Sequence, residues 1–314
     1  MNGILNQYKV KKYDIKNNNR SSTVISTKVN KIYIINLKQD IVRRHYIGML
    51  MKKYNIGFTL IVVEKINDLF WEQFNKTCVL TRGEIGCCLS HLWCLRDIIK
   101  NNYENAIIFE DDIIFHKDFH TLFSRVWNPT FDFLLLGACD FSFSSMHYNK
   151  VNNGLYQIDP SAQKVYGAHA NYYSLTGAKK MFELKSQHFS FFDSHYLQMF
   201  EAFPQSAFIC YPNLVVSDIS TTNLDHEYPF LSLQETNYYK KCFVDFRFTD
   251  YHFIYLDLFI KIKDTIINDT DTYETVLTKI LEHTFFNMEK VRQIKNRLTL
   301  NFFTVKDVTK LLSC

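Results

Sequence analysis

The stretch Lys31-Ile-Tyr-Ile-Ile-Asn-Leu37 is a short, almost continuous apolar run that ends in polar residues. Such a run is typical of a strand that is buried on both faces of a parallel sheet. Residues 41–54 follow with apolar positions at helical spacing and basic residues between them, and Phe58–Val63 is a second apolar run of strand length. The order of strand, helix and strand predicts a β-α-β unit.

The same alternation continues along the chain. We expect a helix from about Arg82 to Asn101, a strand at Asn105–Phe109 and a further strand at Phe131–Leu136. Strands that alternate with helices of this length predict an α/β domain with a mostly parallel central sheet. Such sheets bind their ligands at the carboxyl ends of the strands.

The two ends of the chain differ from this pattern. Residues 1–28 are polar and show no apolar period, so we expect a flexible leader. Helical periodicity without strand signals marks Asp257–Ile267, Thr272–Met288 and Val305–Leu312. We therefore expect a leader (1–28), an α/β domain (29–244) and a helical C-terminal segment (245–314), which could complete a binding cleft, form a lid or make a homodimer contact.

The composition excludes several classes of protein. With 47% apolar and 22% charged residues the chain is not a disordered tail, and no apolar run approaches the roughly 20 residues of a membrane span. The net charge of +4 does not require a nucleic-acid partner. The N-terminus lacks a secretory signal and the 8 cysteines form no CxxC pair, which predicts reduced thiols and a cytoplasmic location, or a host cytoplasm or virion for a viral protein. Frequent Phe, Tyr, Asn, Ile and Lys, which all use A/T-rich codons, indicate an A/T-rich genome.

The strongest local signal is the acidic triplet Glu110-Asp111-Asp112 between two apolar runs. Three adjacent carboxylates at the end of a buried strand repel one another unless a cation neutralises them, and oxygen ligands suit Mg²⁺ or Mn²⁺. An ion held there could bridge the phosphates of a nucleotide and stabilise a departing diphosphate. The alternative is that these residues are solvated loop acids between two hairpin strands.

A second signal is the segment Thr81–Leu92, which has two glycines three residues apart at a helix start, followed by Ser90 and His91. Free N–H groups at a helix start favour phosphate, although the spacing is not that of a P-loop. The alternative is tight helix packing, with Glu84 as a capping acid and His91 as a hydrogen-bonded core histidine.

A third signal follows the first strand at Asn36–Arg44. The strand-to-helix turn is a common place for a nucleotide, and the paired residues Arg43 and Arg44 can make bidentate contacts to phosphate. The alternative is a solvated first helical turn.

Together these three segments resemble glycosyltransferase family 25, which includes bacterial lipopolysaccharide galactosyltransferases and procollagen galactosyltransferases, with viral relatives. The order and spacing of residues 35–44, 82–91 and 109–113 match that family, and so do Gly167–Lys180 and Phe192-Asp193. The resemblance covers about residues 30–225. The sequence departs from the family at Asn171, where an aromatic residue is usual, and in the loose run Gln39–Ile41, which bears on the sugar and acceptor preference.

The resemblance implies a GT-A fold in which the acidic triplet plays the DxD role and holds Mn²⁺ (or Mg²⁺) against the diphosphate of a UDP-sugar. On this basis we expect Glu110, Asp112 and His226 to bind the metal, although His226 could equally be a loop histidine. The residues expected to contact the nucleotide are Asn36, Leu37, Arg43, Arg44, Glu84, Ser90, His91 and Asp111.

The family inverts the anomeric carbon, so the resemblance also implies a general base that deprotonates the acceptor hydroxyl. Asp193 is the candidate for this catalytic residue, and its alternative role is a helix N-cap for Ser194–Phe200. The expected reaction moves galactose or glucose from a UDP-sugar to a hydroxyl of a glycan or of a protein side chain such as hydroxylysine. The alternatives are a nucleotide-binding or scaffold protein of the same fold without turnover and, ranked last, a metal-dependent phosphohydrolase.

Overall fold

The computed structural model describes residues 1–16, 23–75, 80–138, 148–152, 154–158 and 165–217. In these ranges the helices are α1 (Asn2–Gln7), α2 (Val24–Lys28), α3 (Ile41–Lys53), α4 (Asp68–Asn75), α5 (Arg82–Asn101), α6 (Phe119–Val126), α7 (Leu175–Gln187) and α8 (Tyr196–Ala202). A short 3-10 helix, η2 (Phe192–His195), precedes α8. The strands are β1 (Val10–Ile15), β2 (Lys31–Leu37), β3 (Phe58–Val63), β4 (Asn105–Glu110), β5 (Ile113–Phe115), β6 (Phe133–Leu135), β7 (Tyr148–Asn152), β8 (Leu155–Ile158), β9 (Ala170–Ser174), β10 (Ala207–Cys210) and β11 (Val215–Ser217).

The described strands form a nine-stranded sheet in the order β1-β3-β2-β4-β9-β6-β10-β8-β7, and β5 pairs with β11 in a separate ribbon. β2 is parallel to both β3 and β4, and β6 is parallel to β10. β9 runs antiparallel between β4 and β6, and β1 and β8 are also reversed. Six of the nine strands therefore point the same way, which confirms the predicted α/β fold with a mostly parallel sheet.

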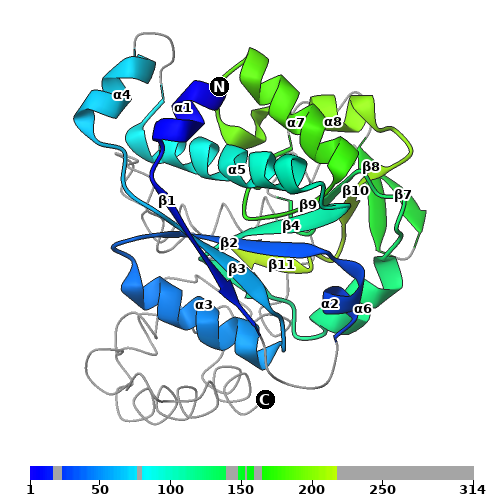
Figure 1. Ribbon diagram of the computed structural model, residues 1–314. Coiled ribbons are helices and arrows are strands. Elements are labelled where there is room, and N and C mark those ends of the chain that lie inside the picture. Colours follow the sequence, from blue (N-terminus) through cyan, green and yellow to red (C-terminus); the bar gives the residue numbers. More distant parts are fainter. Residues whose placement is uncertain (17–22, 76–79, 139–147, 153, 159–164, 218–314) are drawn as a thin grey trace, which may run out of the picture.

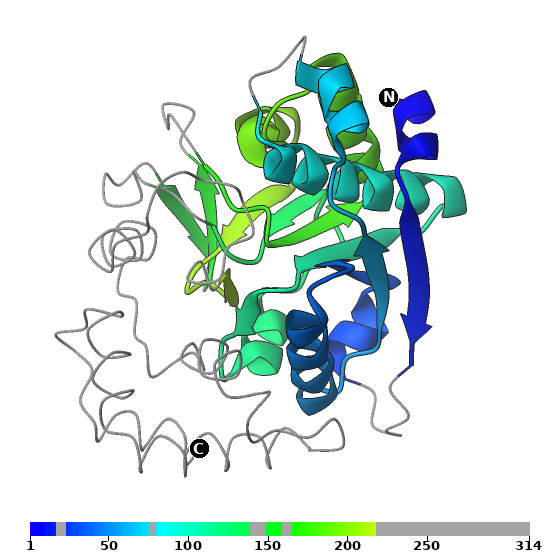
Figure 2. The same cartoon turned by 90° about the vertical axis from the view of Figure 1, so that its left-hand side faces the viewer.

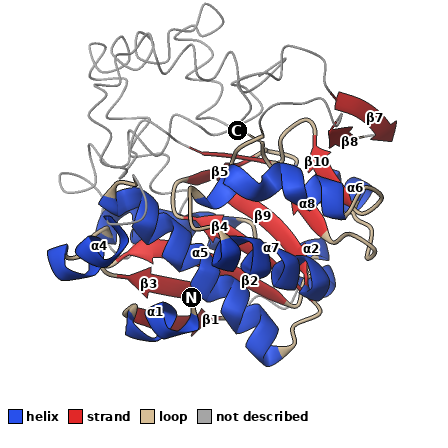
Figure 3. Ribbon diagram, turned by 90° about the horizontal axis from the view of Figure 1, so that it is seen from above, coloured by secondary structure: helices blue, strands red, loops and turns tan. Residues whose placement is uncertain are grey.

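Helices cover both faces of this sheet. Figure 1 shows α1, α5, α7 and α8 on one face and α2, α3 and α6 on the other, and the view turned by 90° in Figure 2 shows the same layers. α5 and α7 lie side by side over the sheet (Figures 1 and 3). Because both faces are covered, β3 is buried along its whole length, and β2 and β4 along most of theirs. The predicted strands at 31–37 and 58–63 and the predicted helix at 82–101 coincide with β2, β3 and α5.

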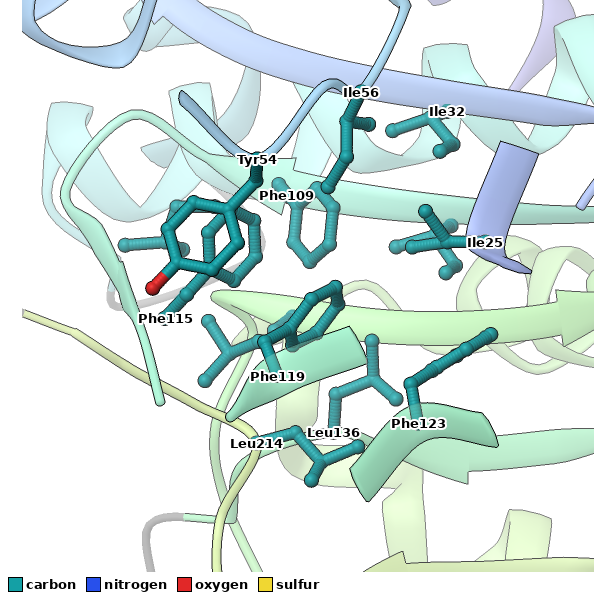
Figure 4. Packing of buried hydrophobic residues seen from close by; sticks show 14 of the residues in the cluster. Ile25, Ile32, Tyr54, Ile56, Phe109, Phe115, Phe119, Phe123, Leu136 and Leu214 are labelled. Carbon is teal, nitrogen blue, oxygen red and sulfur yellow. The ribbon is translucent and has the colours of Figure 1, made fainter. Parts of the chain in front are cut away.

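The core under the α3 face is rich in aromatic rings and fixes the chain that follows the acidic triplet. Figure 4 shows this packing around Phe109, Phe115 and Phe119. The ring centroids of Phe115 and Phe119 are 4.4 Å apart, and Tyr54 meets Phe115 edge-on at 4.8 Å. The turn between β4 and β5 is thereby anchored on both sides by buried strands.

The N-terminal residues correct one expectation. The polar composition of residues 1–28 predicts a flexible leader, but β1 pairs antiparallel with β3 from Val10↔Val63 to Ile15↔Phe58. The preceding Tyr8 is buried, and its hydroxyl hydrogen-bonds to Ser90 Oγ at 2.9 Å. The side chains of β1 are mostly exposed, so backbone pairing at the sheet edge holds this strand. Such a strand has no apolar period by which its sequence would reveal it.

The expected helical C-terminal segment and the boundary near residue 245 lie outside the described residues. In the described ranges, no helix is long and apolar enough to cross a membrane.

Candidate active site

The acidic triplet lies at the carboxyl edge of the parallel strands β2 and β4. Glu110 is the last residue of β4 and is paired with Ile35 of β2, whose next residue is Asn36. Asp111 and Asp112 form the turn to β5 and are 6% and 8% exposed. β5 pairs with β11 and not with β4. These acids are therefore not solvated loop residues between two hairpin strands, and that alternative is wrong.

Glu110 is held from helix α5. Its Oε1 lies 3.0 Å from His91 Nε2 and accepts a hydrogen bond from Cys87 Sγ at 3.4 Å. Burial alone would raise the pKa of Glu110, but the hydrogen bond and the charge of His91 outweigh it and lower that pKa. The ring of His91 is fully buried and stacks on Phe192 with centroids 4.2 Å apart. Glu110 is thus a fixed carboxylate with one oxygen committed to α5.

Asp111 is held from the opposite side. Its Oδ2 accepts from Asn36 Nδ2 at 2.6 Å, and its Oδ1 accepts from Arg43 Nη1 at 2.8 Å. Arg43 also lies 3.6 Å from Asp112 Oδ2. Burial lowers the pKa of the Arg43 guanidinium, but Asp112 and Asp111 outweigh this effect and raise it. Burial and the neighbouring charge of Asp112 raise the pKa of Asp111 to about 7, although Arg43 and Asn36 act in the other direction.

The turn after β2 is fastened by Arg44. Its Nε donates to Asn36 Oδ1 at 2.7 Å, and its Nη2 donates to the carbonyl oxygens of Leu37 at 3.2 Å and Lys38 at 2.8 Å. The side-chain amide of Asn36 therefore has both ends fixed, one by Arg44 and one by Asp111. This turn is an ordered, partly buried structure and not a solvated first helical turn.

The start of α5 is closed by a capping box, and this is the packing alternative to the phosphate site considered for this segment. Glu84 Oε2 accepts from Thr81 N at 2.7 Å and Thr81 Oγ1 accepts from Glu84 N at 3.3 Å, which is a complete capping box. Ser90 Oγ donates to the carbonyl of Gly86 at 2.6 Å and contacts Tyr8. The capping interpretation of Glu84 is confirmed, and Ser90 makes structural contacts. Of the three residues of this segment that were predicted to contact the nucleotide, Glu84, Ser90 and His91, His91 is the one that contacts the acidic triplet.

Asp193 lies in η2 and does not cap α8. The N-cap position of α8 is His195, which makes no capping bond through its side chain, so the N-cap alternative for Asp193 is wrong. Asp193 Oδ2 instead accepts from Gly167 N at 3.0 Å. Gly167 has a φ of 130°, a conformation that favours glycine, and it lies two residues before His169, whose carbonyl accepts from Glu110 N at 2.9 Å. A single short segment therefore connects Asp193 with Glu110.

The donor set at the end of β4 fits a hard divalent cation. Glu110 and Asp112 provide carboxylate oxygens, and no described residue hydrogen-bonds to the second oxygen of Glu110. Asp111 and Asp112 place two acidic groups against the one guanidinium of Arg43, an excess that contributes to the raised pKa of Asp111. A bound cation would neutralise this excess. His226 lies outside the described residues.

Cys87, His91 and Glu110 also bring a sulfur, a nitrogen and an oxygen atom within 4.8 Å of one another. Burial and the charge of Glu110 raise the pKa of the Cys87 thiol well above its usual value. A protonated thiol donates a hydrogen bond, and Cys87 Sγ and His91 Nε2 both contact the same oxygen, Oε1, of Glu110. We therefore interpret these three residues as a hydrogen-bonded cluster that orients Glu110. Cys87 was not among the predicted site residues, although its spacing of four residues before His91 places both on one helix face.

The sequence model of glycosyltransferase family 25 (LPS biosynthesis protein) matches residues 29–196, more than half of the 314 residues. That range contains all the predicted site residues except His226. Among solved structures, the chain is similar to a glycosyltransferase involved in the glycosylation of the major capsid of PBCV-1, with 12% sequence identity and a TM-score of 0.34 over 61% of this chain and 94% of that one. No curated protein matches the chain.

Proposed function

The chain belongs to glycosyltransferase family 25, and from this premise we propose that it is a metal-dependent, inverting enzyme of GT-A type that uses a UDP-sugar. The donor would be UDP-galactose or UDP-glucose, and the acceptor a hydroxyl of a glycan or of a protein side chain such as hydroxylysine. The observation that carries the proposal is the position of Glu110, Asp111 and Asp112 at the carboxyl edge of β2 and β4, where α/β sheets bind ligands.

Glu110 and Asp112 are the residues that we propose for the metal, Mn²⁺ or Mg²⁺. When bound, the cation would stabilise the negative charge that develops on the departing diphosphate. His91 and Cys87 hold Glu110 in one orientation, and Arg43 and Asn36 hold Asp111, so the backbone of the turn is fixed from two sides. The metal ligands would then need little reorganisation on binding.

The nucleotide is proposed to lie against the turn after β2. Asn36, Leu37 and Arg44 form one hydrogen-bonded unit at the carboxyl edge of the sheet, next to Asp111. Arg43 is only 5% exposed and is engaged by two carboxylates. We therefore propose that Arg43 acts on the nucleotide indirectly, by holding Asp111, and that Glu84 and Ser90 support α5.

Asp193 is proposed as the general base. Its carboxylate accepts the proton of the acceptor hydroxyl while the acceptor oxygen bonds to the anomeric carbon and the bond from that carbon to UDP breaks. Attack opposite to the leaving group inverts the configuration. The bond from Gly167 N–H to Asp193 Oδ2 supports this role, since it fixes the direction of the carboxylate.

The test is release of UDP from UDP-galactose and UDP-glucose in the presence of Mn²⁺, with wild type, Asp193→Asn and, as a surface control on α7, Glu183→Gln. We expect Asp193→Asn to lower kcat by about 10²–10⁴-fold, as for the loss of a general base, and the control to match wild type. A protein that binds UDP but releases none from either donor would be the scaffold alternative. Hydrolysis of simple phosphoesters without an acceptor would instead indicate the phosphohydrolase.

A further inference from the structure

Lys185 is a lysine that the reaction does not explain. It lies in the last turn of α7 and is 0% exposed. Its ammonium donates to the Ser190 carbonyl at 3.3 Å, to Ser190 Oγ at 3.3 Å, to Ser194 Oγ at 3.0 Å and to the carbonyl of Phe191. Every one of these acceptors belongs to residues 190–194.

A buried ammonium is costly unless it is matched by acceptors, and an apolar side chain would fill the same space without that cost. The pKa of Lys185 is lowered to about 8 because burial disfavours the charged form. The four acceptors, which share its three N–H groups, offset this cost, and they tie the end of α7 to the segment that leads into η2. The structural effect of Lys185 is therefore concentrated on a few residues.

Residues 190–194 include Asp193, the proposed general base, and Phe192, which packs next to the proposed metal site. Phe192 stacks on His91, which is hydrogen-bonded to Glu110. Asp193 accepts from Gly167 N. Displacement of residues 190–194 would thus move the carboxylate of Asp193 and also remove the ring against which His91 rests.

We propose that Lys185 is a positioning residue for glycosyl transfer: it holds the turn of residues 190–194 so that Asp193 and, through Phe192 and His91, Glu110 keep the geometry that the reaction requires. The inference rests on the proposed function for the roles of Asp193 and Glu110. Its structural part, that Lys185 orders this turn, can be measured without any substrate.

The first experiment is amide hydrogen exchange on the full chain, comparing wild type with Lys185→Met and with Lys179→Met. Lys179 is exposed on the same helix and is the matched control. Lys185→Met is expected to increase exchange in residues 188–196 and in the part of α5 around His91, while β2 and β3 keep their protection and the control is unchanged. Unaltered exchange in residues 188–196 would overturn the proposal.

The second experiment is kinetic, with UDP release from UDP-galactose or UDP-glucose and Mn²⁺. Misplacement of a catalytic group by about 1 Å costs on the order of 10²-fold in rate, so Lys185→Met is expected to lower kcat by about 10²-fold. At saturating Mn²⁺, which compensates for a weakened metal site, the KM for the donor should change by less than about threefold, because none of the residues proposed to contact the nucleotide belongs to this turn. A rise in KM at unchanged kcat would contradict a positioning role.

The double variant Ser190→Ala/Ser194→Ala covers the case in which Lys185→Met does not fold. It keeps the lysine and removes two of its acceptors, so we expect a loss of kcat that is smaller than in Lys185→Met. A double variant with the same kcat as wild type would overturn the inference. If wild type itself releases no UDP from either donor, the proposed function fails. The exchange experiment then still decides whether Lys185 orders the turn.

Discussion

Glu110 at the end of β4 and His91 on α5 are joined by a 3.0 Å contact between Oε1 and Nε2. This contact connects the carboxylate proposed as a metal ligand to α5, where the ring of His91 stacks on the ring of Phe192. The site is therefore assembled from segments that are far apart in the chain. Its parts can be tested one at a time.

Replacement of His91 by leucine removes the partner that orients Glu110. Loss of such a supporting residue typically costs about 10–100-fold in metal affinity or activity. We expect the Mn²⁺ concentration for half-maximal UDP release to rise by about that factor. His120→Leu is the control, because His120 bonds to the Tyr54 carbonyl at 2.7 Å in the other layer. Equal Mn²⁺ dependence of His91→Leu and wild type would contradict the role assigned to His91.

Arg43→Met leaves two buried carboxylates without their cation. Removing one partner of a buried pair is expected to lower the free energy of unfolding by about 3–5 kcal/mol, measured by urea denaturation. Lys38→Met breaks an exposed pair with Glu64, whose side chains are 60% and 42% exposed. That control should cost less than about 1 kcal/mol. A similar small loss in both variants would show that Arg43 is not a buried ion-pair partner in solution.

Gly167→Ala tests the segment between Asp193 and Glu110. Gly167 has a φ of 130°, so a side chain there is expected to cost about 1–3 kcal/mol of stability. It should also lower UDP release, because the Gly167 N–H fixes Asp193. Gly48→Ala in α3 meets nothing within 4 Å and should instead raise stability by about 0.5–1 kcal/mol, as expected for a helix interior. Wild-type stability and turnover in Gly167→Ala would contradict the described geometry.

Tyr8→Phe tests the position of the N-terminal residues. Tyr8 is 8% exposed and its hydroxyl bonds to Ser90, so its removal is expected to cost about 1 kcal/mol in the free energy of unfolding. Tyr13→Phe, on a residue that is 49% exposed, should have no measurable effect. No difference between the two variants would favour a leader that is detached from the domain.

The central strands and α5 could be predicted because their apolar residues follow the spacing expected of buried strands and of a helix packed on a sheet. β3 is apolar at almost every position, and the helix of residues 82–101 begins at a capping box that Thr81 and Glu84 reveal by their spacing. β1 could not be predicted in the same way, because it is an edge strand with exposed side chains. The antiparallel β9 was missed as well: its residues read as a family motif, and its direction depends on tertiary pairing with β4 and β6.

The candidate site could be predicted in part. The acidic triplet and the turn at Asn36 were visible as polar residues that follow apolar runs. That Arg43 faces Asp111 and Asp112 could not be inferred, since charge pairing across 68 positions leaves no local signal. The same is true of Lys185, since a lysine between Leu184 and Ser186 gives no sign in the sequence that it is fully buried.

The main proposal for this protein is that the carboxylates at the end of β4 support transfer from a UDP-sugar with the help of a divalent cation. Its most direct test is the rate of UDP release from UDP-galactose and UDP-glucose, with Mn²⁺ and with EDTA, for wild type, Asp112→Ala and the control Asp118→Ala, whose side chain is 58% exposed. We expect Mn²⁺-dependent release by wild type and by the control, and loss of release in Asp112→Ala. Equal turnover by wild type and Asp112→Ala would contradict it.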